Sequence, residues 1–181
     1  MRAVRLLLAA LGVAASLAVG LVVLAAGPST PDRAALVPAG TIHLPAQAGP
    51  DAGLRLWSPC VDLANAERAK IGRAPLAIDL RMARAATAHS AEQAARLLMT
   101  HDGANGSDAG DRITSAGFTW SAWGENVARG QRDCAAVVTA WMNSSGHRAN
   151  ILSASYTHIG MGAVRGSNGS IYWTMDLAAA R

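Results

Sequence analysis

The stretch THIGMGAVRGSNGSIYWTMDLAA, residues 157–179, marks the place where the chain changes from helical to extended periodicity. Its two apolar segments, residues 157–166 and 170–179, are predicted to be β-strands. Between them lies GSNG, residues 166–169, which consists of turn-forming residues, so the strands should pair as a hairpin with a short loop. Further strand structure is expected around Trp123.

Upstream of this hairpin the periodicity is helical. Ser58 is expected to cap a first helix, with Pro59 at its first position and Gly72 at its end. A second helix should follow Asp79, its expected N-cap, because apolar residues recur there at helical spacing.

Two more helices are predicted before the hairpin. GDRITSAG, residues 110–117, is typical of a short helix that ends at Gly117, and DCAAVVTAWMNS, residues 133–144, of a helix capped by Asp133. The following GHRANIL, residues 146–152, is expected to form a loop. Helices therefore come first and strands last, which favours an α+β layered domain over a run of βαβ units.

The N-terminus has the pattern of an export signal. Arg2 and Arg5 precede residues 6–26, an uncharged apolar run. Small residues at the end of the run would allow cleavage after Ala25 or Ala26, but the run is also long enough for a retained membrane anchor. In both cases the rest of the chain is predicted to be extracellular, either secreted or tethered to the outer face of the cytoplasmic membrane.

The remaining chain divides into a linker and one domain. Residues 27–56 are rich in Pro, Gly and Ala without a steady period, which predicts a flexible tether. The folded domain is expected to occupy residues 57–181.

The charge balance does not indicate a nucleic-acid partner. Lys and Arg number 16 against 12 Asp and Glu, and without Arg2 and Arg5 the balance is 14 to 12, or +2. No basic run or aromatic interleaving of the kind found in nucleic-acid binding surfaces is present. The protein is expected to be a monomer that meets the membrane only through its N-terminal segment.

Two cysteines, Cys60 and Cys134, favour a disulfide in an exported chain. Such a bridge would close a long loop and stabilise the fold by roughly 2–4 kcal/mol, mainly by restricting the unfolded chain. The alternative is a pair of separate buried thiols.

Few titratable side chains in the domain are candidates for chemistry. His89 lies within the second predicted helix, and a buried histidine held by a hydrogen bond is the simplest interpretation of it. His101 follows that helix ahead of a Gly-rich segment, Glu125 lies in GEN, and His147 lies in GHR. Taken singly, each is more often structural than functional.

Four motifs in order make the pattern specific. They are AHSAEQAARLLMTHDG (residues 88–103), GENVARG (124–130), WMNSSGHRANIL (141–152) and the two closing strands. The chain resembles the CAP superfamily of cysteine-rich secretory, antigen 5 and pathogenesis-related proteins, and most closely its bacterial extracellular SCP-like branch. The resemblance implies a three-layer α-β-α sandwich with a cleft lined by two His and two Glu. By motif, His101, Glu125 and His147 fill three of these positions. Ser144 stands at the position of the second Glu, so the set of four is incomplete.

These side chains allow three kinds of function. His101, His147 and Glu125 have the donor types of a divalent-metal site, with zinc as the first candidate. With two strong ligands such a site should be weak and should weaken further at low pH as the imidazoles protonate. A polar network without metal is the alternative.

The second kind is an extracellular hydrolase acting on peptide or cell-wall material. Ser144 would serve as nucleophile, His147 as base and Glu125 as orienting acid, although no nucleophile elbow or oxyanion hole is evident.

The third kind is a binding module for a lipid, a sterol-like apolar ligand or a cell-envelope component, which the resemblance also implies. Trp120 and Trp123 flank GEN and are candidates to line a ligand groove, with core packing as the alternative. Trp141 and Trp173 are assigned to the core. A non-enzymatic module with a metal site and an apolar ligand is the preferred interpretation, with the hydrolase as the alternative.

Overall fold

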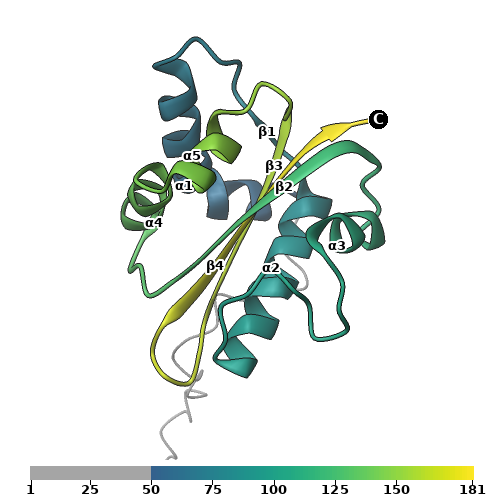
Figure 1. Cartoon of the computed structure of the whole chain (residues 1–181), viewed down its shortest axis with the longest axis vertical. Coiled ribbons are helices and arrows are strands. Elements are labelled where there is room, and N and C mark those ends of the chain that lie inside the picture. The colour runs from purple at the N-terminus through teal and green to yellow at the C-terminus, as the bar shows by residue number, and fades with distance from the viewer. Residues whose placement is uncertain (1–49) are drawn as a thin grey trace, which may run out of the picture. The chain divides into compact units, whose positions relative to one another are not determined.

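The structure, a computed structural model, describes residues 50–181, and their side chains from Ser58 onward. The predicted signal or anchor and residues 27–49 of the predicted linker lie outside the described residues. The elements are α1 (Pro50–Ala69), β1 (Ala77–Ile78), α2 (Leu80–Arg96), α3 (Ala109–Ser115), β2 (Trp120–Arg129), α4 (Cys134–Met142), α5 (Ser145–Leu152), β3 (His158–Arg165) and β4 (Ile171–Ala180) (Figure 1). No helix within this range has both the length and the hydropathy needed to cross a membrane.

The sheet is built around the predicted hairpin. Strands β3 and β4 pair antiparallel, β2 pairs antiparallel with the other side of β4, and β1 adds to β3 in parallel. The order β1-β3-β4-β2 leaves β2 at one edge of the sheet. The hairpin and the strand around Trp123 are thus confirmed.

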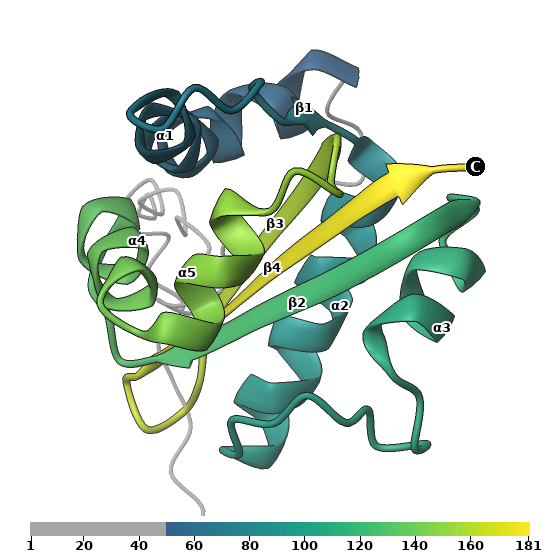
Figure 2. The same cartoon turned by 45° about the horizontal axis from the view of Figure 1, so that its top comes forward.

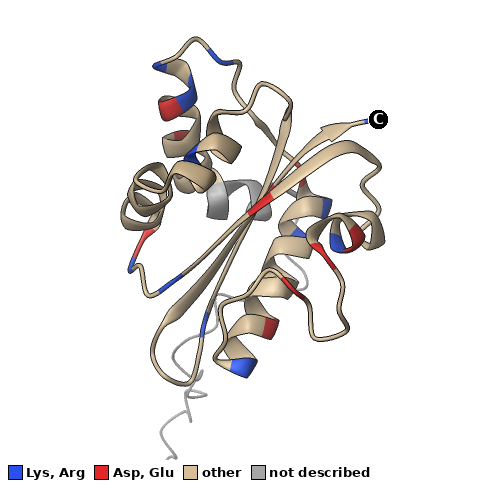
Figure 3. Ribbon diagram, viewed as in Figure 1, with Lys and Arg blue, Asp and Glu red and all other residues tan. Residues whose placement is uncertain are grey.

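Helices cover both faces of this sheet. Helices α2 and α3 lie on one side, whereas α1, α4 and α5 lie on the other (Figures 1 and 2). The predicted α+β class and the three-layer α-β-α sandwich are therefore confirmed. Basic and acidic residues are interspersed along the helices of both layers, with no element carrying one sign alone in a long run (Figure 3).

Two glycines of β3 allow α2 to pack directly on the sheet. A Cβ atom at Gly160 would collide with the backbone of Met82, and one at Gly162 with the backbone of Ala86. The alternating GMG pattern places both glycines on the same face of the strand, because successive residues point to opposite faces. Close contact between α2 and the sheet thus requires that residues 160 and 162 have no Cβ atom.

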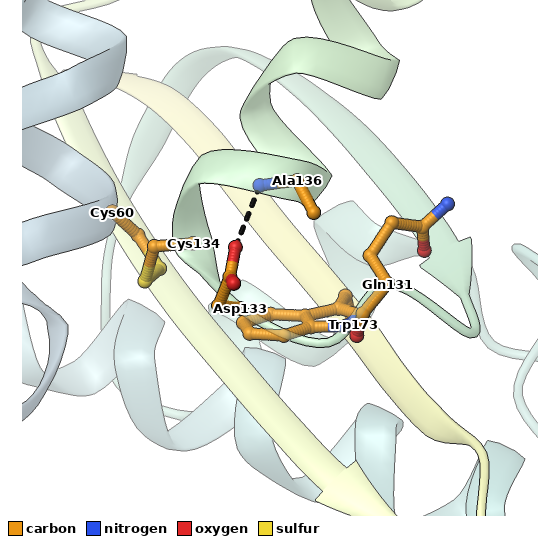
Figure 4. Close-up of a disulfide and its surroundings, with 6 residues drawn as sticks. All are labelled: Cys60, Gln131, Asp133, Cys134, Ala136 and Trp173. Carbon is orange, nitrogen blue, oxygen red and sulfur yellow. Dashed lines mark hydrogen bonds between the residues drawn. A yellow bond between two sulfur atoms is a disulfide. The ribbon is translucent and has the colours of Figure 1, made fainter.

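The layer formed by α1, α4 and α5 encloses the larger apolar core. Trp141 of α4 and Trp173 of β4 have exposed fractions of 1% and 4%. They pack there with residues of α1 and with the face of the sheet that is turned away from α2. Cys60 of α1 and Cys134 at the start of α4 form a disulfide, with 4.8 Å between their Cα atoms (Figure 4). The predictions of the bridge and of the two core tryptophans are confirmed.

Aspartate side chains cap the starts of α2 and α4. Asp79 accepts hydrogen bonds from the backbone N–H groups of Arg81 and Met82, and Asp133 accepts one from Ala136, as predicted. The first boundary was predicted wrongly. Helix α1 begins at Pro50, so Pro59 lies inside it and Ser58 does not start it. A Ser-Pro pair resembles a helix start because proline at the first helical position loses no hydrogen bond, whereas Pro59 inside α1 lacks the N–H that would bond to the preceding turn.

Helix α5 replaces the loop expected after α4. Its eight residues include Gly146, and only Ile151 is buried. A helix this short has almost no intrinsic stability and depends on tertiary contacts, so its periodicity gives a weak signal in the sequence.

Candidate functional site

Strand β2 carries Glu125 and is tied to the segment after it by side chains. Three outward carbonyl groups of this edge strand accept side-chain hydrogen bonds: Trp123 from Tyr156 Oη (2.9 Å), Glu125 from Asn150 Nδ2 (3.2 Å) and Val127 from Trp141 Nε1 (3.2 Å). Such donors satisfy backbone groups that would otherwise be free to pair with another chain. They also hold α4, α5 and the chain leading into β3 against β2.

Two asparagines place His147 beside this edge. Asn126 Nδ2 donates to the backbone oxygen of His147 at 3.0 Å, and Asn150 Nδ2 donates to Asn126 Oδ1 at 2.9 Å. Asn150 therefore holds its segment against β2, and that segment is a helix where a loop was expected. The GEN and GHR motifs, distant in sequence, are joined by this pair of amides.

The other end of α5 is held by a buried arginine. Arg68 of α1 is 2% exposed, and its Nη1 donates to the backbone oxygens of Ile151 and Ser153, both at 2.7 Å. These bonds satisfy carbonyl groups at the helix C-terminus that have no partner within the helix. Helix α5 is thus held at both ends, and the position of His147 follows from the packing of α1 and β2.

Glu125 is the centre of the charged groups. Its Oε1 accepts a hydrogen bond from His101 Nδ1 at 2.7 Å, and its Oε2 accepts one from Arg112 Nη2 at 2.6 Å. The Glu125 side chain is 2% exposed and that of His101 is 56% exposed. The charge of the buried Glu125 carboxylate is thus compensated by Arg112. The same carboxylate holds the imidazole of His101, which is partly exposed to solvent.

The two imidazoles have pKa values shifted in opposite directions. The hydrogen bond to Glu125 raises the pKa of His101, against a smaller opposing effect of burial. Burial lowers the pKa of His147, and the nearby His101 lowers it further. His101 is bonded to the Glu125 side chain, and the backbone of His147 is bonded to the side chain of the next residue of β2, Asn126. The structure brings His101, Glu125 and His147 into one neighbourhood, which we call the His101–Glu125–His147 cluster.

His89 is a buried neighbour of this cluster. It is 1% exposed, and its Nε2 donates to the backbone oxygen of Thr100 at 2.9 Å. The same nitrogen lies 3.9 Å from Glu125 Oε2. The interpretation of His89 as a buried, hydrogen-bonded histidine is confirmed, and the bond fixes the residue that immediately precedes His101.

Ser144 lies at the N-cap position of α5, one turn before His147. Its side chain makes no capping bond, and no hydrogen bond between its hydroxyl and His147 is present among the described residues. The nucleophile–base pair of a serine hydrolase is thus not formed in this conformation.

Trp120 and Trp123 pack between β2 and α3. Their rings meet edge to face with centroids 6.3 Å apart, and Trp120 Nε1 donates to Gly110 O at 3.1 Å. Both rings contact an apolar cluster that contains Ile113 and Phe118. Their role in lining a ligand groove stays a prediction.

Sequence reasoning missed two members of the charged neighbourhood. The first is Arg112 of α3, which pairs with Glu125. Asp176 lies directly opposite Glu125 on the neighbouring strand and is fully buried, with no well-formed hydrogen bond to either carboxyl oxygen within residues 58–181. Burial, and then the charge of Glu125, raises the pKa of Asp176 well above its ordinary value. The sequence feature that could have pointed to Asp176 is its position as an acidic residue within the apolar strand segment YWTMDLA.

The sequence matches the profile of the cysteine-rich secretory protein family, CAP, over residues 61–177. YkwD of Bacillus subtilis (strain 168) is 43% identical over 116 residues, covering 64% of this chain and 44% of YkwD. The membrane protein YlbC of the same strain is 34% identical over 105 residues, covering 58% of this chain and 30% of YlbC. The chain thus spans less than half the length of either curated relative.

Solved structures share the fold. An extracellular protein containing an SCP domain from Bacillus anthracis str. Ames has a TM-score of 0.61 and 27% identity over 72% of this chain and 44% of that one. An outer surface protein of Borrelia burgdorferi has a TM-score of 0.61 and 20% identity over 71% of this chain and 92% of that one. With a profile match over well more than half of the chain, the motifs in the predicted order and the same α-β-α layers, this chain belongs to the CAP family.

Proposed function

We propose that the chain is an extracellular binding module whose His101–Glu125–His147 cluster binds a divalent cation, with zinc as the first candidate, weakly and reversibly. The observation that carries the proposal is the 2.7 Å bond between Glu125 Oε1 and His101 Nδ1. A carboxylate that accepts from one ring nitrogen fixes the tautomer and directs the other nitrogen outward, which is the usual arrangement around a metal-bound histidine.

The donor set fits a weak site. Both Glu125 oxygens are already engaged, by His101 and by Arg112, so Glu125 is better suited to orient His101 than to bind the cation itself. The ligands supplied by the chain are then His101 Nε2 and His147. Within the described residues no group of three or more His, Cys, Asp or Glu side chains is gathered in a metal-binding arrangement. Two imidazoles leave the remaining positions to water or to a bound partner.

The location outside the cytoplasm is supported by three independent features. The N-terminal pattern is that of an export signal, the disulfide is of a kind that persists in oxidising compartments, and the structurally similar Bacillus anthracis protein is described as extracellular. In this setting the partner would be a cell-envelope component, or a lipid or sterol-like molecule. Mass spectrometry of lipid extracted from the purified protein tests the apolar ligand, and an extract with no bound lipid would count against it.

Isothermal titration calorimetry with zinc tests the metal site. We expect saturable heat for the wild type and none for His101→Ala/His147→Ala. Glu125→Gln should weaken binding by about 10- to 100-fold, because it removes the orienting carboxylate and leaves both imidazoles. His158→Ala is the matched control, since that ring packs against Phe118 with centroids 5.3 Å apart. Equal heats for the wild type and the double variant would refute the proposal.

One observation favours the alternative of a hydrolase. Two imidazoles with pKa values displaced in opposite directions resemble an acid and base pair, with His101 holding a proton and His147 accepting one. Ser144 would have to turn toward His147 to act as nucleophile. A fluorophosphonate probe tests this role. Labelling that depends on Ser144 and His147 would support it, and absence of labelling would exclude a serine nucleophile.

A further inference from the structure

A hollow between α2 and α3 adjoins the His101–Glu125–His147 cluster through Arg112, which pairs with Glu125, but it is lined by none of the three cluster residues. Its volume is about 380 Å³, within the usual range for small-molecule sites. The residues that line it come from α2, from α3 and from the loop between these two helices. The lining residues are Arg84, Ala85, Ala88, Asn105, Ser107, Arg112, Ser115 and Ala116.

The hollow contains one uncompensated positive charge. Arg84 is exposed and has no hydrogen-bond or ion-pair partner among residues 58–181. Arg112 also lines the hollow, but its charge is compensated by Glu125 at 2.6 Å. The Nε atom of Arg112 is buried and without a hydrogen-bond partner among the same residues. Anion binding in the hollow would therefore depend chiefly on Arg84.

The remaining walls are either small and apolar or neutral and polar. Ala85, Ala88 and Ala116 present methyl groups, so there is room for small apolar substituents. Ser107, Ser115 and Asn105 supply hydroxyl and amide groups that can donate to an anion. A guanidinium fork together with such donors suits a planar carboxylate.

A neighbouring hollow limits the charge of the ligand. It shares Asn105, Ser107 and Ser115 with the first hollow and contains Asp111. A ligand extending into this region would bring a second negative group toward the Asp111 carboxylate. A single carboxylate with a small apolar body fits both hollows better than a polyanion does.

We propose that the hollow between α2 and α3 binds a monocarboxylate with small apolar substituents, such as the C-terminal carboxylate of a short peptide, with Arg84 as the residue that recognises the anion. This proposal is independent of metal binding by the histidines, because the hollow shares no residue with the proposed zinc ligands.

The test measures binding of N-acetyl-alanyl-alanine to the purified protein, and of the same dipeptide with its C-terminus amidated, by calorimetry at millimolar concentrations. Butyrate is a second probe, which distinguishes a free carboxylic acid from a peptide terminus. We expect the acid form to bind and the amide to bind at least about tenfold more weakly, since a hydrogen-bonded charge is lost. Arg84→Gln should weaken binding of the acid by a similar factor.

Two further variants make the result specific to the hollow. Ala88→Phe keeps Arg84 but fills the space, and should abolish binding. Arg96→Gln removes another exposed arginine of the same helix and should bind like the wild type. Thermal unfolding of all three variants checks that they are folded. The proposal is overturned if neither acid binds, if acid and amide bind alike, or if Arg84→Gln or Ala88→Phe binds as the wild type does.

Discussion

Glu125 and Asp176 are directly opposite each other on the paired strands β2 and β4, and both carboxyl groups are buried. Among residues 58–181, Glu125 is paired with Arg112, whereas no cationic side chain forms an ion pair with Asp176. Burial, and then the nearby charge of Glu125, raise the pKa of Asp176 well above its ordinary value, so the ionised form of Asp176 is disfavoured in the folded state.

Asp176→Asn is expected to increase the free energy of unfolding at pH values above the ordinary Asp pKa of 3.8, because asparagine buries no ionisable group. The folded state holds a proton on Asp176 that the unfolded state releases above its ordinary pKa of 3.8, so the wild type loses stability as pH rises from there toward the raised pKa. The advantage of the variant should therefore grow as the pH rises from 3.8 toward the raised pKa of Asp176. Urea unfolding at several pH values measures it.

Asp133→Asn is the control, because the pKa of Asp133 is lowered whereas that of Asp176 is raised. Hydrogen bonding to Ala136 N–H lowers the pKa of this helix cap, so its contribution to stability is lost as pH falls through that lowered pKa. The Asp133 variant should be less stable than the wild type at pH 7, with a difference that shrinks in acid. If both variants showed the same pH trend, the raised pKa of Asp176 would be contradicted.

The imidazoles should titrate on opposite sides of the ordinary histidine value of 6.5, with the pKa of His101 above and that of His147 below. The stability linked to His101 is complete below pH 6.5 and is lost as pH rises through its raised pKa. Glu125→Gln should lower the pKa of His101, because the hydrogen-bonded carboxylate is the main cause of the shift. NMR titration of the ring protons measures both values. Glu67→Gln, which removes a carboxylate paired with Lys70 on α1, should leave His101 unchanged.

Gly160→Ala is expected to destabilise the fold by about 3 kcal/mol, because the added methyl group meets the backbone of α2 at Met82 and Ala83, which cannot move like a flexible side chain. Gly146→Ala is the matched control. That glycine lies in α5 with open space around it, and alanine there should stabilise by up to about 1 kcal/mol. Thermal and urea unfolding compare the two. A Gly160 variant as stable as the wild type would contradict the close contact between α2 and β3.

Reduction of the Cys60–Cys134 bridge is expected to lower the free energy of unfolding by about 2–4 kcal/mol, because the bond spans 74 residues and restricts the unfolded chain. Urea unfolding with and without reductant measures this loss. The variant Cys60→Ser/Cys134→Ser should be destabilised similarly and should no longer respond to reductant. An effect of reductant on this variant would show that the loss has another cause.

Much of the fold was predictable because its signals are local. The turn residues of GSNG fixed the position of the β3–β4 hairpin, and the caps Asp79 and Asp133 fixed two helix starts. Where an element depends on contacts between residues far apart in the sequence, it was predicted wrongly or not predicted. Helix α5 is held by Asn126 and Arg68, and β1 exists only as a short partner of β3.

By itself, the sequence determined the family, the α+β class and the identity of three side chains in the candidate site. Motif order and residue type are properties of the linear chain, and they need no coordinates. Only the tertiary structure decided how those side chains are used. Strand pairing sets Asp176 against Glu125, and helix packing brings Arg112 to the same carboxylate. Charge compensation and burial depend on groups far apart in sequence, so these electrostatic roles arise only when the layers come together.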